Sequence, residues 1–196
     1  MSCLAPGLKN DRGTDAMQPE VIDPQIPLLK DEKTRREAWI ETISAIWVST
    51  PDRDKPFPEE VNFRAWNLGN MIMSKLHAST QTVERTRSQI AAQFVDHIYF
   101  QYHLSGQSKI DATSSETPLH DGDIALIDMS QPIFAHAYTG VDAIGLTIPR
   151  RAFDTRVGEM GDLHRSVLSR RGQPLVRLFS DHLQNMRHCL DSADDS

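Results

Sequence analysis

The eight histidines are the first residues in this sequence that could do chemistry, because imidazole is the most common protein ligand for transition metals. A metal site inside a β-barrel takes two or three histidines and a carboxylate around one open position. The chain has no His-x-His pair, and the best-placed histidines, His97 and His103, share one expected strand. Six residues along a strand span about 20 Å, which is too far for one ion. The sequence therefore predicts no metal ligands and no cofactor.

Nucleophilic catalysis has as little support. The chain contains no Gly-x-Ser-x-Gly motif, and its ten glycines form no phosphate-binding loop. The two cysteines, Cys3 and Cys189, lie near opposite ends and have no neighbouring base in the sequence. We therefore expect no catalytic residues and no enzymatic activity.

Aromatic residues on the expected strands suggest a different chemistry, which is the binding of a small molecule. A pocket with aromatic walls and a few polar groups is the usual way to hold such a ligand. Trp66, His97 and Tyr99 are the residues that we expect to line it. The alternative is that the aromatic side chains simply fill the interior of a small barrel.

The elements that would position these residues follow from the hydrophobic periodicity. Short segments of period two, separated by turn signals such as Gly69-Asn70 and Asp121-Gly122, predict an antiparallel sandwich or barrel. We expect Asp123 and Asp128 to accept hydrogen bonds from turn amides. The expected strands cover residues 61–68, 71–78, 89–104, 109–113, 124–129, 133–138 and 142–148.

Helices are expected on both sides of the strands. Apolar spacings of three and four predict one helix over 31–49, with Asp31 as its cap, and another within 151–170. Residues 1–30 lack periodicity and hold four prolines, so we expect a flexible N-terminal arm there, with the folded domain over 31–196.

A third helix is predicted to begin at Pro174 and to carry a marked apolar stripe. The stripe could pack on the domain's own core or on a second copy of the chain. As a homodimer interface it would involve Leu175, Phe179, Leu183 and Met186. On that hypothesis Leu183→Asp should give a monomer.

Composition and charge limit the classes of function. Hydrophobic residues make up 39% of the chain, which is enough for a core, and no segment has the roughly 18 apolar residues of a membrane span. The N-terminus shows no signal peptide, so we expect a cytoplasmic protein without a membrane partner. The net charge of −6 argues against direct binding to DNA phosphates.

Several motifs, taken in order, resemble the N-terminal domain of AraC-type transcription regulators. The matching segments are 85–91, 99–106, 122–132, 148–151 and 163–164. The resemblance implies a cupin-like antiparallel β-barrel followed by two C-terminal helices, which senses a small-molecule effector and dimerises. It also implies a DNA-binding domain of about 100 residues with two helix-turn-helix units, to which no positions here correspond. DNA would then be contacted only through that domain.

Two alternatives to a sensing regulator domain remain at this point. One is a stand-alone metalloenzyme of the cupin type, which would need converging ligands that the sequence does not show. The other is a barrel that dimerises and binds no ligand, which a filled interior would favour.

Overall fold

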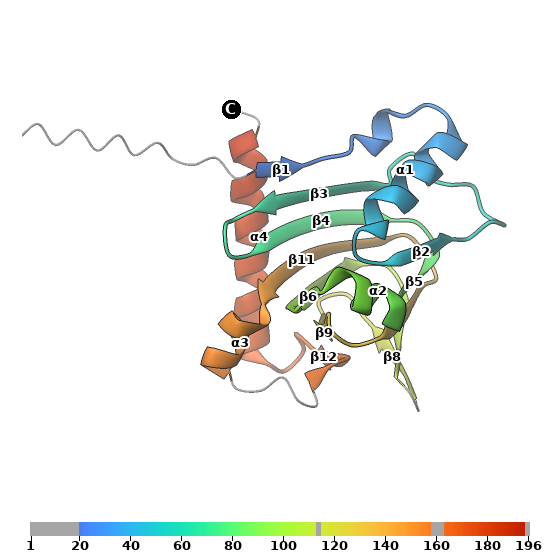
Figure 1. Ribbon diagram of the computed structural model, residues 1–196. Helices are drawn as coiled ribbons and strands as arrows, with labels where there is room; N and C mark the ends of the chain where they lie inside the picture. Colours follow the sequence, from blue (N-terminus) through green and yellow to red (C-terminus); the bar gives the residue numbers. More distant parts are fainter. Residues whose placement is uncertain (1–19, 113–114, 158–162, 195–196) are drawn as a thin grey trace, which may run out of the picture.

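The computed structural model describes residues 20–112, 115–157 and 163–194, whose strands form two antiparallel sheets (Figure 1). The larger sheet has the order β1-β3-β4-β11-β6-β9-β12. Its strands are β1 (Glu20–Ile22), β3 (Asn62–Asn67), β4 (Ile72–Ala78), β11 (Val141–Pro149), β6 (His97–Ser105), β9 (Ile124–Asp128) and β12 (Ser166–Leu168). The smaller sheet is built from β2 (Val48–Pro51), β5 (Gln81–Arg85), β10 (Ile133–Ala137), β7 (Ser108–Ala112) and β8 (Ser115–Leu119), in that order.

Helices flank the sheets. They are the 3-10 helix η1 (Ile26–Leu28), α1 (Glu32–Ser44), α2 (Arg87–Gln93), α3 (Arg150–Val157) and α4 (Pro174–Asp194). In Figure 1 α4 crosses the strands of the larger sheet at one side of the molecule, and α1 lies at the other side. The predicted class, mainly β with flanking helices, is confirmed, although the strands form two separate sheets and not one closed barrel.

Helix α1 begins at the predicted cap, where the Asp31 carboxylate accepts a hydrogen bond from the Thr34 amide at 2.8 Å. It buries Trp39 and Ile43 but ends at Ser44, five residues earlier than expected. The following residues form β2 and pair with β5. Val48 and Thr50 are β-branched and favour a strand, and Pro51 is tolerated because β2 is an edge strand.

The expected strand over 89–104 is wrong in its first half, which is helix α2. The Thr86 hydroxyl accepts from the Gln89 amide, and the Gln89 side chain accepts from the Thr86 amide. This capping box fixes a helix start. Phe94 ends the helix with a φ of 51°, and β6 begins three residues later. The local cap prevails over the alternating pattern that suggested a strand.

The N-terminal and C-terminal connections also differ from expectation. Residues 20–22 pair with β3, and Ile26 of η1 is fully buried, so this part of the expected arm is packed on the domain. Residues 1–19 lie outside the described part. The helix expected within 151–170 is α3 alone, and β12 follows it. The sequence analysis did not predict five of the strands, which are β1, β2, β5, β8 and β12.

The turn predictions hold where a fixed geometry is needed. Gly122 has a φ of +91°, a conformation that glycine adopts without strain. Asp123 accepts from the His120 amide at 3.0 Å, and Asp128 accepts from the Ser130 amide at 2.9 Å. These bonds hold the two ends of β9, the central strand of the β6–β9–β12 side of the sheet.

The two faces of the larger sheet have different partners. The outer face packs against α4 through a cluster that includes Met73, Tyr102, Ile144 and Leu183. The inner face looks toward the smaller sheet and carries Tyr99, Ala125 and Ile127. Since side chains alternate along a strand, one residue step decides which environment a side chain enters. Within the described residues no helix is long and apolar enough to cross a membrane.

Candidate ligand cavity between the two sheets

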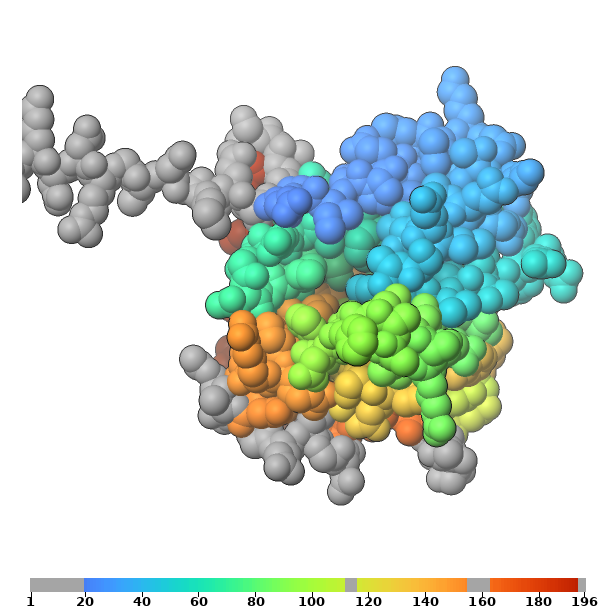
Figure 2. Space-filling model, viewed as in Figure 1, coloured from blue at the N-terminus to red at the C-terminus, as the bar shows by residue number. Residues whose placement is uncertain are grey.

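A cavity of about 320 Å³ lies between the two sheets. The larger sheet contributes residues of β3, β4, β11, β6 and β9, and the smaller sheet contributes β5, β10, β7 and β8. Residues of α1 and of the segment after it cover one end, and Figure 2 shows this segment next to α2 on the near face of the molecule. The volume falls in the lower part of the roughly 300–1,000 Å³ range of small-molecule sites.

Aromatic side chains form part of the cavity wall, as a ligand-binding interpretation requires. Trp39 is 1% exposed, and its indole nitrogen donates to Gln81 Oε1 at 2.8 Å and to Ser49 Oγ at 3.2 Å. Ser49 donates to the same Gln81 oxygen at 2.6 Å. The indole N–H of Trp39 is therefore satisfied by neighbouring side chains, and this fixes the ring. Trp47 lies beside Tyr99, with 6.1 Å between the ring centroids.

Tyr99 is the central polar group of the cavity. Burial raises the pKa of its hydroxyl to about 12, although the hydrogen bond with Ser74 acts in the opposite direction. At neutral pH the hydroxyl is therefore protonated. A Cβ placed on Gly145 of β11 would lie 2.7 Å from Tyr99 Oη and 2.4 Å from Ser74 Oγ. The bare glycine backbone thus makes the space that Tyr99 and Ser74 occupy.

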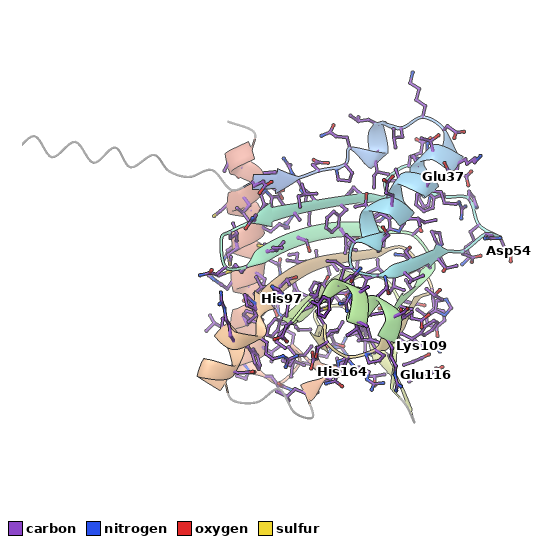
Figure 3. All side chains as sticks on the ribbon, viewed as in Figure 1. Glu37, Asp54, His97, Lys109, Glu116 and His164 are labelled. Atoms are coloured by element: carbon purple, nitrogen blue, oxygen red, sulfur yellow. The ribbon has the colours of Figure 1, made fainter. Side chains whose placement is uncertain are left out.

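Two polar atoms in the cavity lining have no partner within the described residues. They are His97 Nδ1, at the start of β6, and Ser108 Oγ, at the start of β7, and both are buried. In Figure 3 His97 lies centrally on the sheets, whereas the labelled charged residues Glu37, Asp54, Lys109 and Glu116 lie at the periphery. Buried polar groups normally find hydrogen-bond partners, so these two atoms next to the cavity are exceptions.

Besides Tyr99, the described cavity lining carries two side chains that can take up or release a proton, His97 and His136. The side chains around the cavity include no Asp, Glu, Lys or Arg. Across the part of the chain that the structure describes, no three His, Cys, Asp or Glu side chains converge in a way that could hold a metal ion. The described lining therefore offers an apolar surface, several hydrogen-bonding groups and two imidazole rings.

The structure separates the three residues that the sequence suggested for a pocket. His97 and Tyr99 both line the cavity, on the inner face of β6. Trp66 is fully buried on the other face of the larger sheet, in the cluster that includes Val176 and Leu183 of α4. Its position on β3 has the opposite parity to Phe63, which does line the cavity.

Sequence reasoning missed most of the cavity wall. Trp39, Ser74, Gln101 and Thr147 were not singled out, although all of them line it. Trp39 was visible only as part of an apolar helix stripe. The polar members share the inward parity of their strands with apolar neighbours, and nothing in a single sequence marks them as lining a cavity.

The residues expected at a dimer interface are also divided. Leu183 is fully buried, and Phe179 and Met186 pack against the same cluster on the chain's own sheet. Leu175 is 80% exposed, and Leu178, one turn further on, is 68% exposed. The main apolar stripe of α4 therefore serves the core of its own domain, and Leu183→Asp would test folding and not association.

Comparisons with known proteins agree with this architecture. The sequence pattern of the AraC-binding-like domain family matches residues 37–196. The crystal structure of the AraC-like transcriptional activator CuxR is similar with a TM-score of 0.73 and 16% identity, over 87% of this chain. This chain spans 60% of the CuxR structure.

Other solved structures match less of the chain. Ectoine synthase from P. lautus has a TM-score of 0.37 and 13% identity, over 50% of this chain and 73% of that one. An RmlC-like cupin protein from Desulfovibrio desulfuricans has a TM-score of 0.33 and 13% identity, over 41% and 73% respectively. A search of curated protein sequences gives no significant match.

Proposed function

The chain belongs to the AraC-binding-like domain family, and from this premise we propose that it is the sensing domain of a transcription regulator. The cavity between the two sheets carries the proposal, because it is large enough for a small effector and is walled by fixed aromatic rings. The described residues of the same lining include no Asp, Glu, Lys or Arg, and we propose a sensor and not an enzyme.

A filled cavity should abolish sensing. Ala135 lines the cavity from β10, and Ala92 is exposed on α2. In a thermal-shift screen with small metabolites, compounds that stabilise the wild type should not stabilise Ala135→Phe, because the larger side chain takes the ligand's place. Ala92→Phe should respond as the wild type does. Compounds that stabilise all three proteins alike would show that binding occurs elsewhere.

The larger sheet offers a direct route from the cavity to α4. Tyr99 faces the cavity, while Tyr102 on the same strand faces α4 and accepts a hydrogen bond from Gln184 at 2.9 Å. Lys75 of β4 forms an ion pair with Asp191 of α4, and its neighbour Ser74 lines the cavity. We propose that a ligand acts by stabilising one arrangement of the sheet against this helix.

We further propose that α4 joins two copies of the chain through its outer face. Leu175 and Leu178 are exposed there, and His182, Asn185 and Cys189 continue the stripe at helical spacing. A self-complementary helix face is typical of twofold symmetric dimers. This face replaces the one predicted from Leu183.

Analytical ultracentrifugation at tens of micromolar protein tests the interface. The wild type should sediment as a dimer and Leu178→Asp as a monomer, because a carboxylate cannot be buried between the helices without a partner. Arg177→Asp is the control, since Arg177 is exposed on α4 and is not three or four residues from any member of the proposed stripe. A monomeric wild type, or a dimeric Leu178→Asp variant, would contradict the interface.

Contact with DNA is proposed to belong to a separate domain. The net charge of −6 makes this domain a weak ligand for phosphates. In a fluorescence anisotropy titration at physiological salt, the 196-residue chain should show no sequence-specific affinity for duplex DNA. Tight sequence-specific binding would contradict the proposal that a separate domain contacts DNA. We expect such a regulator to act in the cytoplasm.

A further inference from the structure

We infer that the ligand of this cavity is an uncharged, mainly apolar molecule with hydrogen-bonding groups, and that carboxylates and cations of the same shape are rejected. The inference rests on the proposed sensing function and specifies the chemical class that the cavity selects. It follows from the charge, polarity and volume of the lining.

The absence of charged groups around the cavity is the first argument. The described side chains of the lining include no Lys or Arg that could pair with an anion and no Asp or Glu that could pair with a cation; the groups there that could gain a positive charge are the imidazoles of His97 and His136. Moving an ion from water into such surroundings is strongly unfavourable unless a partner of opposite charge is present. A neutral ligand avoids this cost.

The polar atoms that do line the cavity suit a neutral hydrogen-bonding ligand. Ser74, Tyr99, Gln101 and Thr147 lie on three adjacent strands, β4, β6 and β11, and so form one wall. Tyr99 stays protonated at neutral pH because burial raises its pKa to about 12. The other sheet contributes the apolar side chains of Val83, Ile133 and Ala135 and also polar ones, from Gln81, Ser108 and His136. A mainly apolar ligand that carries neutral hydrogen-bonding groups matches this mixed lining.

The unpartnered atoms strengthen this point. His97 Nδ1 and Ser108 Oγ are buried atoms of residues that line the cavity, and they bond to nothing in the described residues. They come from β6 and β7, which belong to different sheets. Leaving a buried polar atom without a partner is unfavourable, so a ligand whose binding gave either atom a partner would gain affinity.

Arg85 is a buried cation that hydrogen-bonds to two residues of the lining, Ile46 and Met129, so an anion drawn to Arg85 is the alternative to a neutral ligand. It is fully buried, with no carboxylate within ion-pair distance in the described residues, and its Nη2 has no partner. The carbonyl oxygens of Met129 and Ile46 and the amide oxygen of Gln93 hold the guanidinium. Arg85 does not itself line the cavity. Its charge opposes a cationic ligand, and a carboxylate would reach it only if the intervening residues moved.

The volume limits the size of the ligand. A cavity of about 320 Å³ corresponds to roughly ten water molecules at ~30 Å³ each. A molecule with one or two fused rings fits this space. The aromatic rings of Trp39, Trp47 and Phe63 offer flat surfaces against which such a ligand would pack.

Three compounds of nearly identical shape isolate the effect of charge. They are 2-naphthamide, which is neutral, 2-naphthoate, which is an anion, and 2-naphthamidine, which is a cation near neutral pH. We would titrate each into the full chain by isothermal calorimetry and repeat the titrations with Ala135→Phe and Ala92→Phe. The amide should bind at least about tenfold more tightly than either ion, and Ala135→Phe alone should lose this binding.

The other possible results of these titrations would each contradict the inference. Equal or tighter binding of 2-naphthoate would overturn the inference and indicate a carboxylate ligand drawn to Arg85, with sensing in the cavity still intact. Tighter binding of 2-naphthamidine than of 2-naphthamide would also overturn the inference and would indicate a cationic ligand. If none of the three bound at millimolar concentration, both the ligand class and the proposed sensing function would be contradicted. Amide binding that survives Ala135→Phe would place the site outside the cavity and refute the inference.

Discussion

At the scale of single residues, the cavity depends on positions where a small change in side-chain volume decides the geometry. Gly145 is the best example, because Tyr99 and Ser74 occupy the space next to its Cα. His164 lies outside the cavity lining and acts through hydrogen bonds: Nδ1 accepts from the Asp128 amide at 3.1 Å, and Nε2 lies 3.1 Å from the Pro132 carbonyl.

Gly145→Ala should disturb the cavity without removing any existing group. The new Cβ would meet Tyr99 Cε2 at 2.6 Å, closer than real contacts allow, so the ring must shift into the cavity. We expect a loss of about 1–3 kcal/mol in the free energy of unfolding, measured by urea denaturation. Gly140→Ala is the control, because its Cβ would make contacts of 3.5 Å or more and should cost little. Equal effects of the two substitutions would contradict this account of Gly145.

The histidine predicts a pH dependence. Burial lowers the pKa of His164, and Arg165 acts in the same direction. As the pH falls through the usual histidine range near 6.5, the unfolded chain takes up a proton before the folded chain does, so stability is lost below that range. His164→Asn keeps an acceptor for the Asp128 amide and removes the titration. Between about pH 7.5 and pH 5, the urea midpoint of the wild type should therefore fall more than that of the variant. Parallel slopes would rule out this role.

At the scale of elements, α4 has two apolar sides with different tasks. The side with Phe179, Leu183 and Met186 packs on the larger sheet, and the side with Leu175 and Leu178 stays exposed. Helical periodicity in the sequence merges the two sides into one broad stripe. Only the packing of the helix on the sheet shows which leucines are free for a partner.

The two sides give opposite expectations for similar substitutions. Leu183→Ala should lower the free energy of unfolding by about 2–5 kcal/mol, because it leaves a cavity in the cluster around Met73 and Tyr102. Leu178→Ala removes an exposed side chain and should change the stability of the monomer by less than about 0.5 kcal/mol. Urea denaturation at low protein concentration checks both values. A larger effect at Leu178 than at Leu183 would show that the helix packs the other way round.

At the scale of the whole molecule, the larger sheet is a wall shared by the cavity and α4. Alternate residues of β4, β6 and β11 face the cavity on one side of the sheet and α4 on the other. A change in the cavity can therefore reach α4 through these strands, without the movement of a described loop. The hydrogen bond between Gln184 and Tyr102 ties the helix to the central strand β6.

Ligand binding should therefore be detectable at α4. In hydrogen exchange measured by mass spectrometry, a ligand bound in the cavity should slow exchange in β4, β6, β11 and α4, because stabilising the sheet stabilises the helix packed on it. Tyr102→Phe removes the acceptor for Gln184 and should weaken the response of α4 while the response of the strands remains. Protection confined to the strands of the wild type would contradict coupling through the sheet.

The sequence by itself determined the class of fold and the local geometry. Alternating hydrophobicity placed β3, β4, β9, β10 and β11 to within a few residues, and Asp31, Gly122 and Asp128 were correctly assigned to caps and turns. These features depend on a residue and its near neighbours along the chain, where side-chain chemistry and backbone conformation are directly linked. The resemblance to AraC-type domains also came from the order of motifs alone, and the family match over 37–196 confirms it.

Tertiary structure alone decided which face each side chain serves. Trp66 and Tyr99 are both buried strand aromatics, yet one packs under α4 and the other lines the cavity. Leu183 and Leu178 belong to one helical stripe, yet one is in the core and the other is exposed. Burial follows from what lies opposite a strand or helix, and that neighbour comes from a distant part of the chain. For this reason the two sides of the larger sheet, and hence the site, had to be read from the folded molecule.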